Sequence, residues 1–128
     1  MRAYIDADIL IWHLRGEKKA LKFLQELRKK REYEMWIGAM QRAEVVFFMR
    51  PEEEYQTMMF LSQFNTAPLT QDVIDHGAEL YRVWNKSHGI DINDALLAAT
   101  IAKTSGTLFC LNTKHYPIPG LSVQRAWR

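Results

Sequence analysis

The feature that most constrains the fold is an apolar run, Tyr4–Trp12, which two aspartates, Asp6 and Asp8, interrupt. A run this rich in Ile, Leu and aromatic residues is typical of a buried strand of a parallel sheet that leads into a helix. We expect the strand to stop at Asp6. A carboxylate at the edge of a buried sheet costs on the order of several kcal/mol unless a cation or hydrogen-bond donors meet it. Asp6 is therefore the first candidate ligand of a metal ion.

The rest of the chain alternates between short strands and helices, which indicates a three-layer α/β/α sandwich with a mainly parallel central sheet. Asp8 is predicted to cap a short helix over residues 9–14, and Thr70 to cap a longer one over residues 71–87. Further strands are expected over residues 33–37, 66–69, 107–111 and 121–123. Further helices are expected over residues 17–31, 39–49 and 51–64, the last stopped by Asn65, and after the acidic turn 89–94.

Composition indicates one globular domain over residues 1–128, because 48% hydrophobic and 25% charged residues suit a chain with a sizeable core. The single Cys110 excludes an intramolecular disulfide, and no signal peptide or long apolar stretch is present. We therefore expect a soluble, cytoplasmic protein without a membrane partner. The net charge of +2 permits a nucleic-acid partner without requiring one, and the basic helix 17–31 is interpreted as a solvated face.

Glu44 is the second candidate acid, because its apolar neighbours, residues 45–48, favour a largely buried helix in which Glu44 lies early. A buried acid needs a partner, which is either a cation or a salt bridge from Arg42 or Arg50. The segment that follows, residues 47–64, carries more large apolar side chains than two surface helices of a small monomer need. That excess indicates either a partner surface or ordinary core packing.

The third candidate lies in an acidic turn that opens a helix of small residues, where Asp91 and Asp94 flank Asn93. The free N–H groups at the start of such a helix favour an ionised carboxylate. Capping explains one acid and not both, so we assign function to Asp94 and leave Asp91 as a cap or a support for a metal ligand. Asn112 follows the strand 107–111 and is expected beside Asp6, at the edge where ligands of open α/β sheets bind.

These stretches together resemble the PIN-domain ribonucleases, and most closely the VapC-type toxins of bacterial and archaeal toxin–antitoxin pairs. The resemblance covers essentially the whole chain and rests on Asp6, Glu44, Asp91–Thr100 and Leu111–Tyr116. The third motif is the most specific, because an acid that opens an Ala-rich helix is uncommon outside the family. The Asp-x-Asp at positions 6 to 8 is weak by itself.

The resemblance implies that Asp6, Glu44 and Asp94 bind a metal ion and that Asn112 completes the catalytic group, with Asp91 close by. Carboxylate and amide oxygens suit Mg²⁺ or Mn²⁺, which would activate a water molecule for hydrolysis of an RNA phosphodiester bond. No covalent intermediate is required. The expected partners are RNA, a small antitoxin whose segment covers the site, and a second copy of the chain in a homodimer, with residues 47–64 as a candidate contact.

Four positions depart from the family pattern. Asp8 stands where the family usually has Asn, Gln41 where it has Thr or Ser, and His115 where it often has a second acid. Asn112 replaces the Asp of many members, so a second metal ion would meet fewer negative charges. Selection among RNAs is expected to depend on loops and on basic residues: Lys18, Lys19, Arg42 and Lys114.

Two alternatives stay open on the sequence. A haloacid-dehalogenase-type phosphatase also places Asp-x-Asp after a first strand, but Ile9 and Leu10 stand where Gly and Thr would follow, and the chain is short for that fold. A PIN scaffold that binds RNA or protein without catalysis is the other alternative, and Gln41, Asn112 and His115 favour it. A side-chain nucleophile is not indicated, because neither Cys110 nor any serine has an adjacent His and acid pattern.

Overall fold

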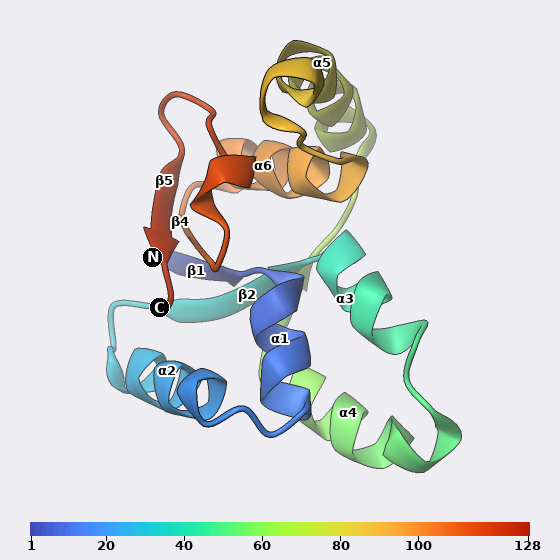
Figure 1. Ribbon diagram of the computed structural model, residues 1–128, viewed down its shortest axis with the longest axis vertical. Helices are drawn as coiled ribbons and strands as arrows, with labels where there is room; N and C mark the ends of the chain where they lie inside the picture. The colour runs from blue at the N-terminus through green and yellow to red at the C-terminus, as the bar shows by residue number, and fades with distance from the viewer.

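The computed structural model describes residues 1–128 and is built around a five-stranded sheet in which all neighbours are parallel. The strand order is β3 (Asn65–Ala67), β2 (Glu34–Gly38), β1 (Arg2–Ile5), β4 (Thr107–Cys110) and β5 (Ser122–Arg125). The helices are α1 (Ala7–Leu14), α2 (Lys18–Lys29), α3 (Ala39–Val46), α4 (Glu54–Leu61), α5 (Gln71–His88) and α6 (Ile92–Thr104), with short 3₁₀ helices η1 (Pro51–Glu53) and η2 (Thr113–His115). Helices lie on both sides of the sheet, which confirms the predicted three-layer α/β/α fold (Figure 1).

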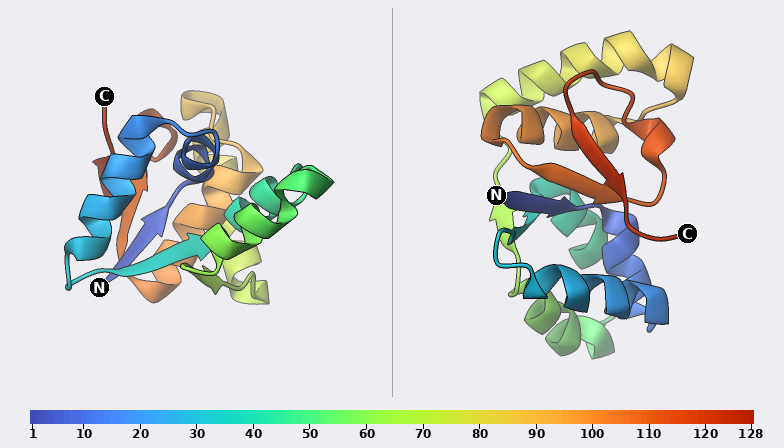
Figure 2. Two further views of the ribbon diagram at one scale, coloured as in Figure 1. Left: turned by 90° about the horizontal axis from the view of Figure 1, so that it is seen from below. Right: turned by 90° about the vertical axis from the view of Figure 1, so that its left-hand side faces the viewer.

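Strand β1 lies between two hydrophobic cores and contributes to both. Ala3 and Ile5 pack in the core beneath α1, α2, α3 and α4, whereas Tyr4 points into the core beneath α6. Side chains alternate between the two faces of a strand, so a strand covered on both faces reads as a continuous apolar run. This accounts for the uninterrupted pattern at the N-terminus, and Figure 2 shows the sheet between the two helical layers.

Strand β1 ends just before Asp6, as predicted, but the first helix begins two residues earlier than predicted. Helix α1 begins at Ala7, and its N-cap is Asp6, whose carboxylate accepts a hydrogen bond from the Ala7 amide at 2.8 Å. Asp8, the predicted cap, lies exposed in the first turn. The prediction for α5 is confirmed, because Thr70 caps it through the Val73 amide at 3.3 Å and Gly89, at φ 66°, ends it.

Helix α3 is shorter than expected, and this changes the surroundings of Glu44. It ends at Val46, so Glu44 lies in its last turn instead of early in the helix. Phe47 and Phe48 lie beyond the helix and are 82% and 83% exposed, so the expectation of a largely buried element is wrong for these residues. The later part of segment 47–64, from Phe60 on, contributes to the core, and a partner surface stays a prediction for its exposed residues.

Helices α5 and α6 pack closely on one side of the sheet (Figures 1 and 2). A Cβ atom on Gly77 of α5 would lie 2.9 Å from Cδ2 of Leu96, so glycine permits this approach. Towards the sheet, α6 buries Leu97, Ala98 and Ile101 in one core with Tyr4 of β1 and Leu108 of β4. None of the helices combines the length and the apolar character that crossing a membrane requires.

Candidate active site

Asp6 lies at the carboxyl end of β1, where the chain passes from the sheet into α1. Its amide donates to the carbonyl of Phe109 in β4 at 3.0 Å, so the main chain is still tied to the neighbouring strand. Its carboxylate oxygen Oδ1 accepts from the Ala7 amide. The first candidate acid is therefore held by the backbone on both sides, at the edge of the sheet where ligands of α/β folds bind.

Asp94 and Asp91 form a reciprocal capping box at the start of α6. The Asp94 amide donates to Asp91 Oδ1 at 2.7 Å, and the Asp91 amide donates to Asp94 Oδ2 at 3.1 Å. The expectation that capping explains only one of these acids is therefore wrong, because both carboxylates serve as caps. Their burial still differs, since Asp91 is exposed whereas Asp94 is only 9% exposed.

Tyr116 joins Asp6 to Asp94. Its hydroxyl group lies 2.9 Å from Asp6 Oδ2 and 3.1 Å from Asp94 Oδ1, and its side chain is only 5% exposed. Sequence reasoning missed this residue, and the only available signal was its position at the end of the polar cluster 112–116. The hydroxyl has one proton and donates to one carboxylate at a time, so it connects two acids that are far apart in the chain.

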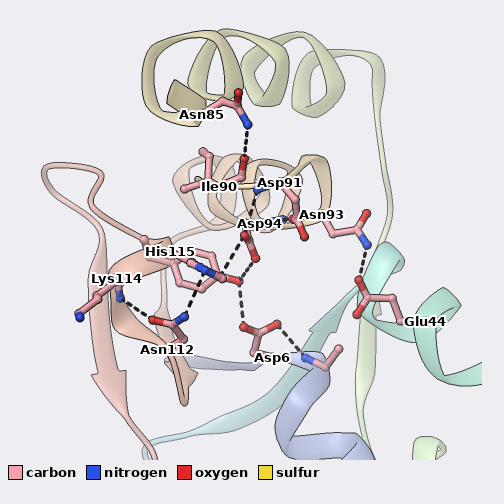
Figure 3. Close-up of polar contacts among 12 residues, drawn as sticks. Asp6, Glu44, Asn85, Ile90, Asp91, Asn93, Asp94, Asn112, Lys114 and His115 are labelled. Atoms are coloured by element: carbon pink, nitrogen blue, oxygen red, sulfur yellow. Dashed lines mark hydrogen bonds and ion pairs between the residues drawn. The ribbon is translucent and has the colours of Figure 1, made fainter. Parts of the chain in front are cut away.

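Glu44 faces the same region from α3, and Asn93 of α6 donates a hydrogen bond to its Oε1 (Figure 3). Neither of the expected partners forms a salt bridge with it, because Arg42 contacts the hydroxyl of Thr66 at 3.4 Å and no ion pair joins Arg50 to Glu44. Asn93 is thus the actual partner. A neutral amide leaves the negative charge of Glu44 uncompensated.

His115 contributes a third contact to Asp94, since its Nδ1 atom lies 3.4 Å from Asp94 Oδ2. The Lys114 amide donates to Asn112 Oδ1 at 3.2 Å, so the Asn112 Nδ2 group faces His115 Nε2 at 3.1 Å and donates to it. When Nε2 accepts, the ring proton of neutral His115 is on Nδ1 and points to Asp94. Asn112 itself is exposed and reaches the acids only through His115.

The three candidate acids share one electrostatic character. Burial, together with the nearby charges of Asp8 and Asp94, raises the pKa of Asp6 from 3.8 to about 7 despite its hydrogen bonds. Burial also raises the pKa values of Glu44 and Asp94, and the charge of Asp91 adds to both shifts. Among the nearby charges, only that of His115 acts in the opposite direction, by lowering the pKa of Asp94.

The residues expected in supporting positions lie at the rim. Asp8 and Asp91 are exposed. The charge of Asp8 acts on Asp6 and Glu44, whereas the charge of Asp91 acts on Glu44 and Asp94, and Asp91 also caps α6. No three of the aspartate, glutamate, histidine and cysteine side chains lie close enough together to hold a metal ion. Hydrogen-bond donors join the acids instead: Tyr116 stands between Asp6 and Asp94, and Asn93 ties Glu44 to α6.

Comparisons with known proteins identify the family. The sequence matches the PIN domain over residues 3–120. The chain belongs to the PIN-domain family. Among its relatives, ribonuclease VapC10 of Mycobacterium tuberculosis is 31% identical over 89% of this chain and 85% of its own length. Ribonuclease VapC19 of the same species is 34% identical over 89% of this chain and 91% of its own length.

Solved structures agree with this assignment. A toxin–antitoxin complex from Klebsiella pneumoniae contains a chain that superposes on this PIN domain with a TM-score of 0.76, 27% sequence identity and 98% coverage of both chains. The expected resemblance is therefore confirmed, and the phosphatase alternative is excluded.

Cys110 of the PIN domain is buried, and burial raises the pKa of its thiol to about 12, which leaves no thiolate for nucleophilic attack.

Proposed function

We propose that the protein is a divalent-metal-dependent endoribonuclease that acts as the toxin of a toxin–antitoxin pair. The observation that carries this proposal is the grouping of Asp6, Glu44 and Asp94. They come from three different elements, face one region beyond the carboxyl end of the sheet, and all have pKa values raised by burial. Since the relatives are VapC ribonucleases, RNA is the proposed substrate.

The donor atoms of this set suit a hard divalent cation, and the three acids would have to move closer together to hold one. Asp6, Asp94 and Glu44 supply carboxylate oxygens, which Mg²⁺ and Mn²⁺ prefer, and an ion among them would compensate the negative charges that burial destabilises. When bound, such an ion polarises a phosphodiester and lowers the pKa of a water molecule. The remaining tasks belong to the chain. The Ala7 and Asp91 amides orient the Asp6 and Asp94 carboxylates.

The fourth corner of the proposed site carries hydrogen-bond donors in place of an acid. His115 points its Nδ1 proton at Asp94, and Asn112 holds the ring in that tautomer. With fewer negative charges there, we propose that the site holds one metal ion. Lys114 is exposed beside this corner and is suited to contact the RNA backbone as a point charge.

The test is cleavage of a mixed RNA pool by purified protein in Mg²⁺, in Mn²⁺ and in EDTA. Wild-type protein should cut only when a metal ion is present. Asp6→Asn and Asp94→Asn should be folded and inactive, since each removes one charge of the proposed ligand set. Asp75→Asn is the matched control, because Asp75 is an exposed acid on α5 next to Lys103 and away from the site. Cleavage in EDTA, or equal loss in all three variants, would contradict the proposal.

A binding module without catalysis is the second candidate, because no three potential ligands lie together and His115 stands where the family often has an acid. The same assay separates the two. A PIN domain that binds labelled RNA but does not cut it in any metal ion, after a mass spectrum excludes a co-purified partner, would support the module.

For partners, we propose an antitoxin and a second copy of the chain. Large apolar side chains are exposed on the α3–α4 side of the molecule: Phe47, Phe48, Tyr55 and Met59 are 82%, 83%, 76% and 54% exposed. Beside them lies a groove of about 420 Å³ that is lined by Ile11, Leu14, Phe48 and Met49 and reaches Glu44. Apolar surface of this kind marks interaction sites, and the similar Klebsiella structure is a toxin–antitoxin complex.

Light scattering after size-exclusion chromatography tests both partners. Wild-type protein should elute as a dimer, or as a larger complex when it is co-expressed with the product of the neighbouring gene. Phe48→Asp should weaken at least one of these assemblies, whereas Val83→Asp on the exposed face of α5 serves as the control. Assemblies unaffected by Phe48→Asp would place the interface elsewhere.

A further inference from the structure

Tyr116 occupies a singular position among the residues of the site, because its hydroxyl is the one group that touches both Asp6 and Asp94. The tyrosine ring packs in the core beneath α6, with Leu97, Ala98 and Cys110 in the same cluster. The Tyr116 amide is bonded to the Thr113 carbonyl at 3.1 Å. A ring fixed in this way holds its hydroxyl at a fixed point between the two carboxylates.

The hydrogen bonds of the two carboxylates divide cleanly. The outer oxygen of each accepts from the backbone, Asp6 Oδ1 from Ala7 and Asp94 Oδ2 from Asp91, and His115 Nδ1 also lies 3.4 Å from Asp94 Oδ2. The other oxygens, Asp6 Oδ2 and Asp94 Oδ1, have Tyr116 as their only donor within the protein. Without the hydroxyl, these two oxygens would face each other with no donor between them, and like charges in a buried place repel.

We propose that Tyr116 is a positioning residue that sets the separation of Asp6 and Asp94 and thereby the affinity of the site for a divalent cation. This inference rests on the proposed function, because it takes these two acids as ligands. The two oxygens cannot be further apart than the sum of their distances to the hydroxyl. Groups that orient metal ligands in this way typically change affinity about 10-fold to 100-fold when they are removed.

The experiment is a calorimetric titration of the metal-free protein with Mn²⁺, for wild type and Tyr116→Phe. Phenylalanine keeps the ring in the core and removes only the hydroxyl. We expect the Kd for Mn²⁺ to rise about 10-fold, and cleavage to recover when Mn²⁺ is raised by the same factor. Tyr4→Phe is the matched control, because Tyr4 is also buried and its hydroxyl bonds Arg2 and Thr104 instead of the acids.

An unchanged or lower Kd in Tyr116→Phe would overturn the inference, and so would an equal rise in Tyr4→Phe, which would mean a general effect on packing. If wild type itself binds no Mn²⁺, the proposed function fails and the inference falls with it. A second measurement uses wild-type protein only, so it remains informative if Tyr116→Phe does not fold. With ¹³Cζ-labelled tyrosine, the Tyr116 resonance should be the one of five that shifts on addition of Mg²⁺, and a Tyr116 resonance that stays in place would overturn the inference.

Discussion

The two sides of the acidic site are built in different ways. Asp6 and Asp94 are held by backbone amides at two helix starts and by the buried hydroxyl of Tyr116. Glu44 lies in the last turn of α3, is partly exposed, and has one side-chain partner, Asn93. One side is therefore fixed by the fold, whereas the other depends on a single contact between flexible side chains. The difference predicts that the two sides respond unequally to substitution.

The largest effect should come from the fixed side. Asp6→Asn is expected to lower the rate of RNA cleavage about 1000-fold or more, since it removes a ligand charge that no neighbour replaces. Glu44→Gln should lower the cleavage rate less, about 10-fold to 100-fold, because Glu44 is held by a single side-chain contact and contributes less to holding the ion. Single-turnover cleavage at saturating Mn²⁺ measures both. Equal losses would remove the distinction between the two sides.

A second test uses the stability of the metal-free protein against pH. The pKa of Asp6 is raised by burial to about 7 in the folded protein, above its value of 3.8 in the unfolded chain. Between these pH values the unfolded chain releases the proton while the folded protein keeps it, so the free energy of unfolding falls as pH rises, and the loss is complete above pH 7. A pKa difference of this size corresponds to a loss of up to about 4 kcal/mol in the free energy of unfolding.

Urea unfolding in EDTA at pH 4 and pH 8 measures this loss. Asp6→Asn should lack that part of the decline, so the variant is expected to be more stable than wild type at pH 8 and to approach it at pH 4. Asp75→Asn, with its exposed acid, should follow wild type at both pH values. An identical decline in Asp6→Asn and wild type would show that other groups cause it.

The variant Asn93→Ala tests the side of the site that Glu44 forms. Loss of the amide leaves Glu44 without its hydrogen-bond partner. The cleavage rate should then fall about 10-fold, which is the smaller effect expected when a group that orients a metal ligand is removed. The melting temperature should change little, because the lost contact joins two partly exposed side chains. A loss as large as that of Asp6→Asn would mean that Asn93 itself takes part in the reaction.

The smallest effect on activity is expected for Asp91→Ala, which separates the cap of α6 from the ligand set. Removing the cap should lower the free energy of unfolding by about 1 kcal/mol, as measured by urea denaturation. Cleavage should change by less than about 3-fold if the Asp94 carboxylate stays in place. Abolished cleavage in a folded Asp91→Ala protein would place Asp91 among the ligands.

The sequence predicted the elements and the layers well, because periodicity and caps are local. Thr70 and Gly89 mark the ends of α5 within one residue, and the doubly buried β1 reads as a continuous apolar run. The N-cap of α1 was assigned to Asp8 instead of Asp6, because two aspartates precede the same apolar stretch and each is an acceptable cap. Local chemistry alone does not separate them.

The candidate acids were found from the sequence, but their partners were not. Arg42 and Arg50 are close to Glu44 along the chain, whereas the actual partner, Asn93, is 49 residues away. Tyr116 is 110 residues from Asp6. A hydroxyl that connects acids across the fold leaves no periodic or spacing signal, so these contacts emerge only from the tertiary structure.

That long connection also has a consequence during synthesis. Asp6 is made early, yet the hydroxyl that joins it to Asp94 follows 110 residues later. At about 5 to 20 residues per second, a nascent chain spends roughly 5 to 20 s with the first acid made and the site incomplete. The contact between Asp6, Tyr116 and Asp94 therefore cannot form until nearly the whole chain has been translated.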